Sequence, residues 1–83
     1  MKINTASELS LFLKNERKQQ QRTQAEVSSN IGIKQPTLSA FEKQSAQSRI
    51  DTLFKIVHEL GLELHLSSNN DVDKDNPEWT EEW

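Results

Sequence analysis

Side chains that can hydrogen-bond to nucleic-acid bases gather in the middle of the chain. Lys34 and Gln35 stand directly before Pro36, and hydroxyls follow at Thr37 and Ser39. A lysine ammonium can donate to guanine O6 and N7, and a glutamine amide can pair with adenine through two hydrogen bonds. Pro36 offers an apolar contact for a thymine methyl group. This spacing predicts a set of contacts to base edges.

Four neighbouring residues suit contacts with phosphate. Thr23 and Gln24 open the preceding expected helix, where free backbone N–H groups favour an anion. Arg22 and Lys43 flank the stretch, and such cations position a protein on a duplex without reading its sequence. For Arg22 and Lys43, an ordinary solvated surface charge is the alternative interpretation.

The chain offers little for catalysis or metal binding. Its two histidines, His58 and His65, have no cysteine to join them, and we expect them at the surface. No Ser/His/Asp group, glycine-rich phosphate loop or carboxylate pair has a pocket to serve, because a helical domain of 83 residues has little room for one. The sequence predicts a binding protein without catalytic residues, metal site or cofactor.

Length and composition favour one small cytoplasmic domain. A core of this size is marginal, and such chains often gain stability by association. The absence of cysteine fits a reducing compartment. No apolar run approaches a membrane span, and the N-terminus lacks the apolar core of a signal peptide.

The net charge of −3 hides two halves of opposite sign. Residues 1–55 carry nine Lys/Arg and five Asp/Glu, a balance of +4, whereas residues 56–83 carry one Lys and eight Asp/Glu, a balance of −7. A basic front and an acidic tail indicate two partners, or a tail that competes for a basic surface.

Capping residues and apolar spacing predict two helices in the first half of the chain. Thr5 and Glu8 have the spacing of a capping box for a helix over 6–19, and Thr23 and Glu26 repeat it for a helix that ends at residue 30. Residues expected to face inward are Leu9, Phe12, Leu13, Val27 and Ile31.

Two more helices are predicted after a glycine turn. Gly32 permits the left-handed backbone at a helix end, and Pro36 suits the first turn of the next helix. After a polar loop over 44–48, we expect Ser48 and Asp51 to cap a fourth helix over 49–60. The apolar residues expected in the core are Leu38, Phe41, Ile50, Leu53, Phe54, Val57 and Leu60.

The second and third predicted helices have the spacing of a helix-turn-helix. Ser28 is small where the helices cross, Gly32 makes the turn, and Ile33 packs the unit from inside. In that unit the second helix presents its N-terminal residues to the major groove. The sequence predicts an all-α fold of four or five helices, with a DNA-binding domain over residues 1–61.

The apolar period changes from 3.6 to 2 after this domain, in the stretch Leu62-Glu63-Leu64-His65-Leu66. Alternation of this kind is typical of a strand, and no second strand pattern occurs to pair with it. We expect residues 62–67 to pair with the same segment of a second copy about a two-fold axis. The alternative is an arm that packs its leucines onto its own helices.

The remaining residues, 68–83, are polar and acidic, and we expect a tail too polar to order alone. Trp79 and Trp83 would have no structural role there. Tryptophan is often a binding anchor, so both are predicted to contact a partner. A role in solubility or turnover is the alternative.

The middle of the chain resembles the phage-repressor-type (XRE-like) helix-turn-helix family. Over about residues 3–83 the chain resembles the HipB-type antitoxins within it. Pro36 departs from the family pattern, which usually has a small non-proline residue there, and Ala40 stands where a polar residue could contact DNA. The residues that carry the resemblance are Thr23, Gln24, the run 31–35, Thr37, Ser39, Phe41, Glu42, the segment 62–66, Glu82 and Trp83.

The resemblance implies the antitoxin of a type II toxin–antitoxin pair. Such a protein binds double-stranded operator DNA as a homodimer in the bacterial cytoplasm, at the nucleoid, and represses its own operon. Its second partner would be a HipA-like serine/threonine protein kinase toxin, which it restrains. Two alternatives stay open: a stand-alone phage-type or cellular repressor, which needs no terminal tryptophan, and a protein-interaction module, which would lack salt-dependent affinity for duplex DNA.

Overall fold

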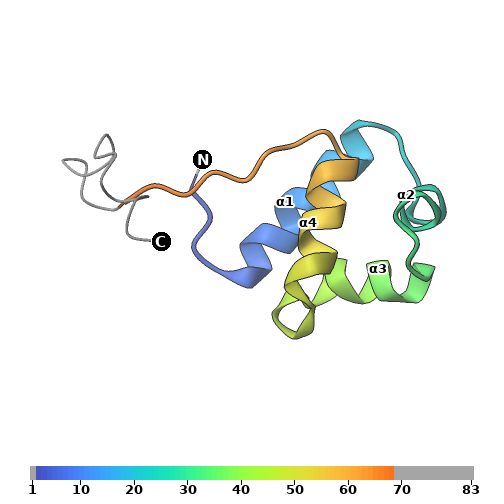
Figure 1. Ribbon diagram of the computed structural model, residues 1–83, viewed down its shortest axis with the longest axis horizontal. Helices are drawn as coiled ribbons and strands as arrows, with labels where there is room; N and C mark the ends of the chain where they lie inside the picture. Colours follow the sequence, from blue (N-terminus) through green and yellow to red (C-terminus); the bar gives the residue numbers. More distant parts are fainter. Residues whose placement is uncertain (1, 69–83) are drawn as a thin grey trace.

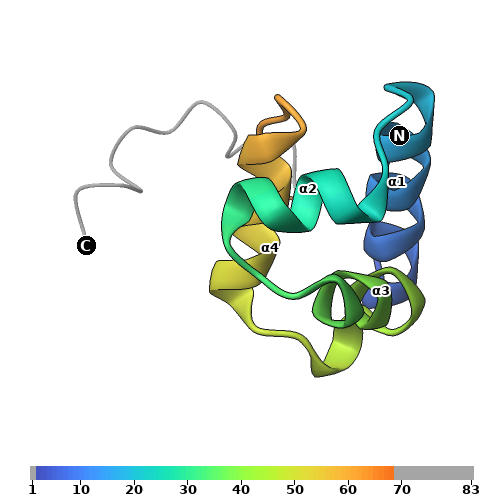
Figure 2. The same cartoon turned by 90° about the vertical axis from the view of Figure 1, so that its right-hand side faces the viewer.

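The computed structural model describes residues 2–68, which form four α-helices and one 3₁₀ turn (Figure 1). Helix α3 packs against α1 and α2, and α2 also packs against α4. Figure 2 shows α1 and α4 at opposite edges of the helical body, with α2 and α3 between them. The elements are α1 (Ala6–Gln19), α2 (Gln24–Ile31), α3 (Gln35–Lys43), η1 (Ser45–Gln47) and α4 (Ile50–Glu59).

The caps of α1 and α2 confirm the predicted starts of both helices. The Thr5 hydroxyl accepts from the Glu8 backbone N–H at 3.1 Å, and the Glu8 carboxylate accepts from the Thr5 N–H at 3.3 Å. The Thr23 hydroxyl caps α2 by accepting from the Glu26 N–H at 3.0 Å. Glu26 turns its carboxylate to Arg22, 3.5 Å away, so the predicted second capping box forms only its first half.

The turn between α2 and α3 depends on Gly32. Its φ of 76° lies in the left-handed region, which glycine adopts without a Cβ penalty. The Ile33 N–H donates to the Ser28 carbonyl at 3.0 Å, and this bond satisfies the last turn of α2. Ser28 is buried, as its place at the helix crossing predicts.

The core lies where α1, α2, α3 and α4 meet. Its buried members are Leu13, Val27, Leu38, Phe41, Ile56, Val57 and Leu60. Leu9, Phe12, Ile31, Ile33, Leu53 and Leu62 pack around them as partly buried residues.

The predicted core face of α4 is partly wrong. Phe54 is 51% exposed and Ile50 is 71% exposed, whereas Ile56, absent from the predicted stripe, is buried. Apolar residues occupy more than one side of this helix, and the bundle covers only the side with Leu53, Ile56 and Val57.

The start of α4 also differs from the prediction. The N-cap is Arg49, one residue after the expected Ser48, and no side-chain hydrogen bond caps the helix. The Asp51 carboxylate accepts instead from the Arg49 guanidinium, at 3.0 and 3.1 Å. The expected polar loop before the helix contains η1, which turns the chain within three residues.

Residues 62–68 leave the C-terminal end of α4 and run away from the helical body without helix or strand (Figure 1). Leu62 packs against the core, but Leu64 is 42% exposed and Leu66 is 91% exposed. Pairing of this segment between two copies stays a prediction. The predictions for the tail, including Trp79 and Trp83, concern residues outside 2–68. Within the described part, no helix is long and apolar enough to cross a membrane.

Candidate nucleic-acid interface

Helix α3 has one buried side and one open side. Leu38 and Phe41 pack into the core, whereas Thr37 and Ala40 are exposed on the opposite side. Gln35 is the exposed first residue of the helix, next to its N-cap. The open side therefore begins at the residue with the strongest predicted base-reading chemistry.

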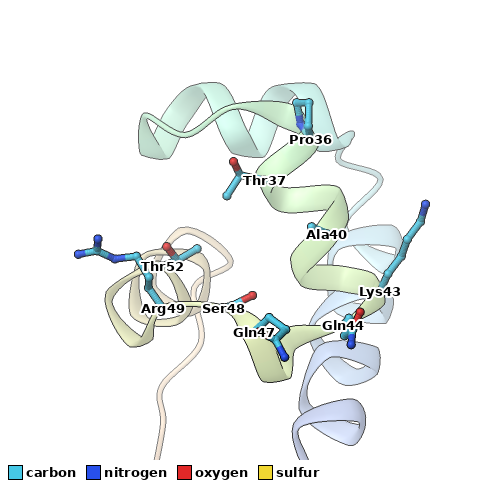
Figure 3. Close-up of a pocket in the computed structure, with 9 residues that line it drawn as sticks. All are labelled: Pro36, Thr37, Ala40, Lys43, Gln44, Gln47, Ser48, Arg49 and Thr52. Carbon is cyan, nitrogen blue, oxygen red and sulfur yellow. The ribbon is translucent and has the colours of Figure 1, made fainter.

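An open groove of about 570 Å³ runs along this side, between α3 and the start of α4 (Figure 3). Figure 3 shows Thr37 of α3 and Thr52 of α4 pointing toward the space between the two helices. No carboxylate is among the nine lining residues, which are Pro36, Thr37, Ala40, Lys43, Gln44, Gln47, Ser48, Arg49 and Thr52. Hydroxyls, amides and two cations suit a polyanion such as a phosphate backbone.

The two cations lie on opposite rims of this groove. Figure 3 shows Lys43 extending from the end of α3 away from α4, and Arg49 extending outward from the start of α4. Asp51 lies outside the groove and pairs with Arg49. The hydrogen bond from Arg49 lowers the pKa of the Asp51 carboxyl below its ordinary value. Both groups are largely exposed, so solvent screens this pair.

A buried ion pair holds α3 in place. The Arg17 guanidinium of α1 donates to both carboxylate oxygens of Glu42 on α3, from Nε at 2.7 Å and from Nη2 at 3.1 Å. The Gln24 amide of α2 donates to the same carboxylate at 2.9 Å, and Arg17 Nη1 donates to the Arg22 carbonyl at 2.7 Å. Burial raises the pKa of Glu42, but the bonds from Arg17 and Gln24 outweigh it and hold the pKa below its ordinary value.

A second polar cluster joins α2 to the last turn of α4. The Arg22 guanidinium pairs with the Glu59 carboxylate and also donates from Nη1 to the Glu59 carbonyl at 2.9 Å. The Asn30 amide donates to the same carboxylate at 2.8 Å. The bonds from Asn30 and Arg22 lower the pKa of Glu59. This cluster and the buried ion pair fix α2 against both of its neighbours.

The structure brings most of the predicted base-contact residues together and turns two predicted phosphate contacts inward. Lys34 and Gln35 are exposed beside the groove, Ser39 is half-buried, and the groove itself includes Pro36, Thr37 and Lys43. Arg22 and Gln24 donate to Glu59 and Glu42 of the same chain, while Thr23 caps α2. Roles in DNA contact for these three residues stay predictions.

Five groove residues were not predicted from the sequence, namely Gln44, Gln47, Ser48, Arg49 and Thr52. Four of them lie in or beside the polar stretch over 44–48, for which the sequence predicts only a loop. A dense run of amide and hydroxyl side chains directly after the reading helix was the available signal. Residues 2–68 contain no cluster of His, Cys, Asp and Glu that could hold a metal ion.

Comparison with known proteins places these features in a family. A helix-turn-helix family model (HTH_3) matches residues 13–66. Antitoxin HipB of Escherichia coli strain K12 is 37% identical over an alignment that covers 94% of each chain. Antitoxin HigA1 of Mycobacterium tuberculosis strain H37Rv is 33% identical over 63 residues, 76% of this chain and 42% of that protein.

Solved structures agree with this assignment. A HipB–O4 20mer complex contains a chain that superposes with a TM-score of 0.80 at 36% identity, covering 84% of this chain and 99% of that one. A HipA–HipB–O2–O3 complex gives a TM-score of 0.81 with the same identity and coverage. The chain thus belongs to the helix-turn-helix family and, within it, to the HipB-type antitoxins.

Proposed function

We propose that the chain is an antitoxin that binds double-stranded operator DNA as a homodimer and represses its own operon. Helix α3 enters the major groove, with Gln35 and Lys34 at base edges and Thr37 beside them. The groove between α3 and the start of α4 receives the phosphate backbone, between the cations of Lys43 and Arg49.

The observation that carries this proposal is the open side of α3. It combines exposed donors at the helix start with a groove that no carboxylate lines, in a chain whose overall charge is negative. A carboxylate on the lining would repel the phosphate backbone, so a lining without one suits this polyanion. The solved HipB complexes with operator fragments support the same use of a chain with this fold.

We also propose that the chain binds and restrains a HipA-like serine/threonine kinase. The solved assembly of HipA, HipB and operator DNA supports this partner, because the HipB in it is similar over nearly its whole length. On this proposal the chain acts by binding, not as an enzyme, and works in the cytoplasm. Trp79 and Trp83 are predicted to contact the kinase, and residues 62–67 are predicted to pair the two copies.

The DNA-binding proposal is tested by replacing Gln35 with alanine. We expect Gln35→Ala to weaken operator binding by about 1–3 kcal/mol, because a base contact of this kind is lost. Affinity for random duplex DNA should change little, since no phosphate contact is removed. Titration of labelled duplexes measures both affinities at one salt concentration.

The matched control is Gln19→Ala, which removes an exposed glutamine at the end of α1, away from the groove. It should leave both affinities unchanged. Equal losses on operator and random DNA for Gln35→Ala would show that Gln35 does not read bases.

A further inference from the structure

One edge of the Arg49 guanidinium is held by the carboxylate of Asp51. Nε donates to one carboxylate oxygen at 3.0 Å, and Nη2 donates to the other at 3.1 Å. A guanidinium carries five N–H donors in a rigid fork, so the edge with Nη1 can donate to a second acceptor while the first edge stays paired. Phosphate oxygens match the spacing of this fork. Arg49 can therefore bind Asp51 and a DNA phosphate together.

The pair stands on the rim of the groove, where the phosphate backbone would pass. Arg49 is a lining residue and extends outward from the start of α4, whereas Asp51 is not part of the lining (Figure 3). The side chain of Arg49 is 81% exposed and that of Asp51 is 55% exposed, so a polyanion can reach both groups. Asp51 thus places a negative charge directly beside a groove whose lining has none.

The pairing restricts where Arg49 can donate. Solvent screens an exposed ion pair, so its contribution to the stability of the fold is small. Its larger effect is on the arginine side chain, which otherwise samples many rotamers at the surface. A fork fixed by Asp51 meets a phosphate in only one position of the duplex, whereas an unpaired cation follows the backbone wherever it lies.

From this geometry we infer that Asp51 makes the contact of Arg49 with DNA selective for operator sequences. The inference rests on the proposed function, in which α3 reads bases and the groove receives the backbone. When Gln35 contacts its base, the duplex has one register, and Arg49 lies between the carboxylate and the phosphate. On other sequences the register is not fixed, so the carboxylate meets phosphate without an intervening cation and repels it. Unfavourable contacts with the wrong partner are a general source of specificity.

The test is Asp51→Asn, which keeps the size of the side chain and removes its charge. Affinity is measured at one salt concentration for two labelled duplexes of equal length, one from the promoter of the chain's own operon and one of random sequence. Affinity for random DNA should rise about fivefold, because a repulsive charge beside the backbone is lost. Affinity for the promoter duplex should rise less, since Arg49 already shields the phosphate there. The ratio of promoter to random affinity should therefore fall.

A double-mutant cycle with Arg49→Ala decides whether Asp51 acts through Arg49. In a chain that already carries Arg49→Ala, Asp51→Asn should raise both affinities alike and leave their ratio the same. A fall of the ratio that is equally large with and without Arg49 would overturn the inference. An unchanged ratio in folded Asp51→Asn would overturn it too. Circular dichroism checks the fold, and Asp51→Ser gives the same test if the asparagine variant unfolds.

Glu63→Gln is the matched control, because it removes one exposed carboxylate that lies away from the groove. Its ratio of affinities should match the wild type. A fall as large as that of Asp51→Asn would assign the effect to net charge and contradict the role given to Asp51. A wild-type chain that prefers neither duplex would instead refute the proposed operator binding.

Discussion

The carboxylate of Glu42 is shared by three helices. It accepts hydrogen bonds from Arg17 on α1 and from Gln24 on α2, while Glu42 itself lies on α3. Burial raises its pKa, but these donors outweigh burial, so the folded chain holds the pKa below its ordinary value. The charged form is thus the one that the folded state prefers.

This preference predicts a dependence of stability on pH. Because the pKa is lower in the folded state, the stabilisation is complete above the unfolded value of about 4.3 and is lost as pH falls through the folded pKa. Urea unfolding of the wild type between pH 7 and pH 3 should show this loss. Glu42→Gln should lose about 3 kcal/mol at pH 7, since Arg17 is left buried without its partner, and should show a smaller loss on acidification.

Glu63→Gln is the control, because it removes an exposed carboxylate outside the helical body. A wild type and a Glu42→Gln variant with the same pH profile would contradict the role assigned to this carboxylate.

At the scale of elements, two left-handed residues shape the turns on either side of α2. Gly32 has φ 76°, and a Cβ built there would meet no heavy atom within 4 Å. Gly32→Ala should therefore lose about 1 kcal/mol of unfolding free energy through backbone strain alone. Gln21 has φ 59°, so Gln21→Gly should remove strain and stabilise the chain. Urea unfolding measures the change in unfolding free energy for both variants. A change of the same sign in the two variants would contradict the role given to the left-handed backbone.

The first three helices could be predicted from the sequence because their signals are local. Thr5, Thr23 and Gly32 act on backbone groups within a few residues of themselves, so their effects do not depend on distant packing. The flank that α4 buries is decided by α2 and the core, which local periodicity does not reveal. The apolar period therefore predicts Phe54 in the core, whereas the structure leaves it 51% exposed.

The candidate site was predictable only in part, for the same reason. Lys34, Gln35 and Thr37 follow from their place at the start of a reading helix. Arg49 and Thr52 reach the groove because η1 turns the chain back beside α3. The sequence of the polar loop does not predict this turn. The pairing of Arg17 with Glu42 joins residues 25 apart and also left no local pattern.

At the scale of the whole molecule, the charge is divided between a basic front and an acidic end. Residues 56–83 carry a balance of −7, and the groove lies in the part before them. We expect deletion of residues 79–83 to weaken binding of a HipA-like kinase by ~10-fold, because tryptophan anchors dominate many interfaces while a tail pays an ordering cost. The affinity for operator DNA should not change. Calorimetry measures the affinity for the kinase and the affinity for the operator.

The double substitution Trp79→Ser and Trp83→Ser is the matched variant, since it keeps the length and the carboxylates of the tail. It should reproduce the loss caused by the deletion. Unchanged kinase affinity in both variants would refute the anchor prediction and leave solubility or turnover as the role of the tail.

The sharing of one carboxylate among α1, α2 and α3 has a thermodynamic consequence for DNA binding. Helix α3 cannot tilt away from α1 and α2 as a body without leaving a buried charge unpaired, so it meets the duplex with its orientation already fixed. The conformational entropy of the reading helix is lost when the chain folds, not when it binds. The heat-capacity change on binding then reflects only the apolar surface that is buried between protein and DNA. It lacks the larger contribution that folding coupled to binding would add.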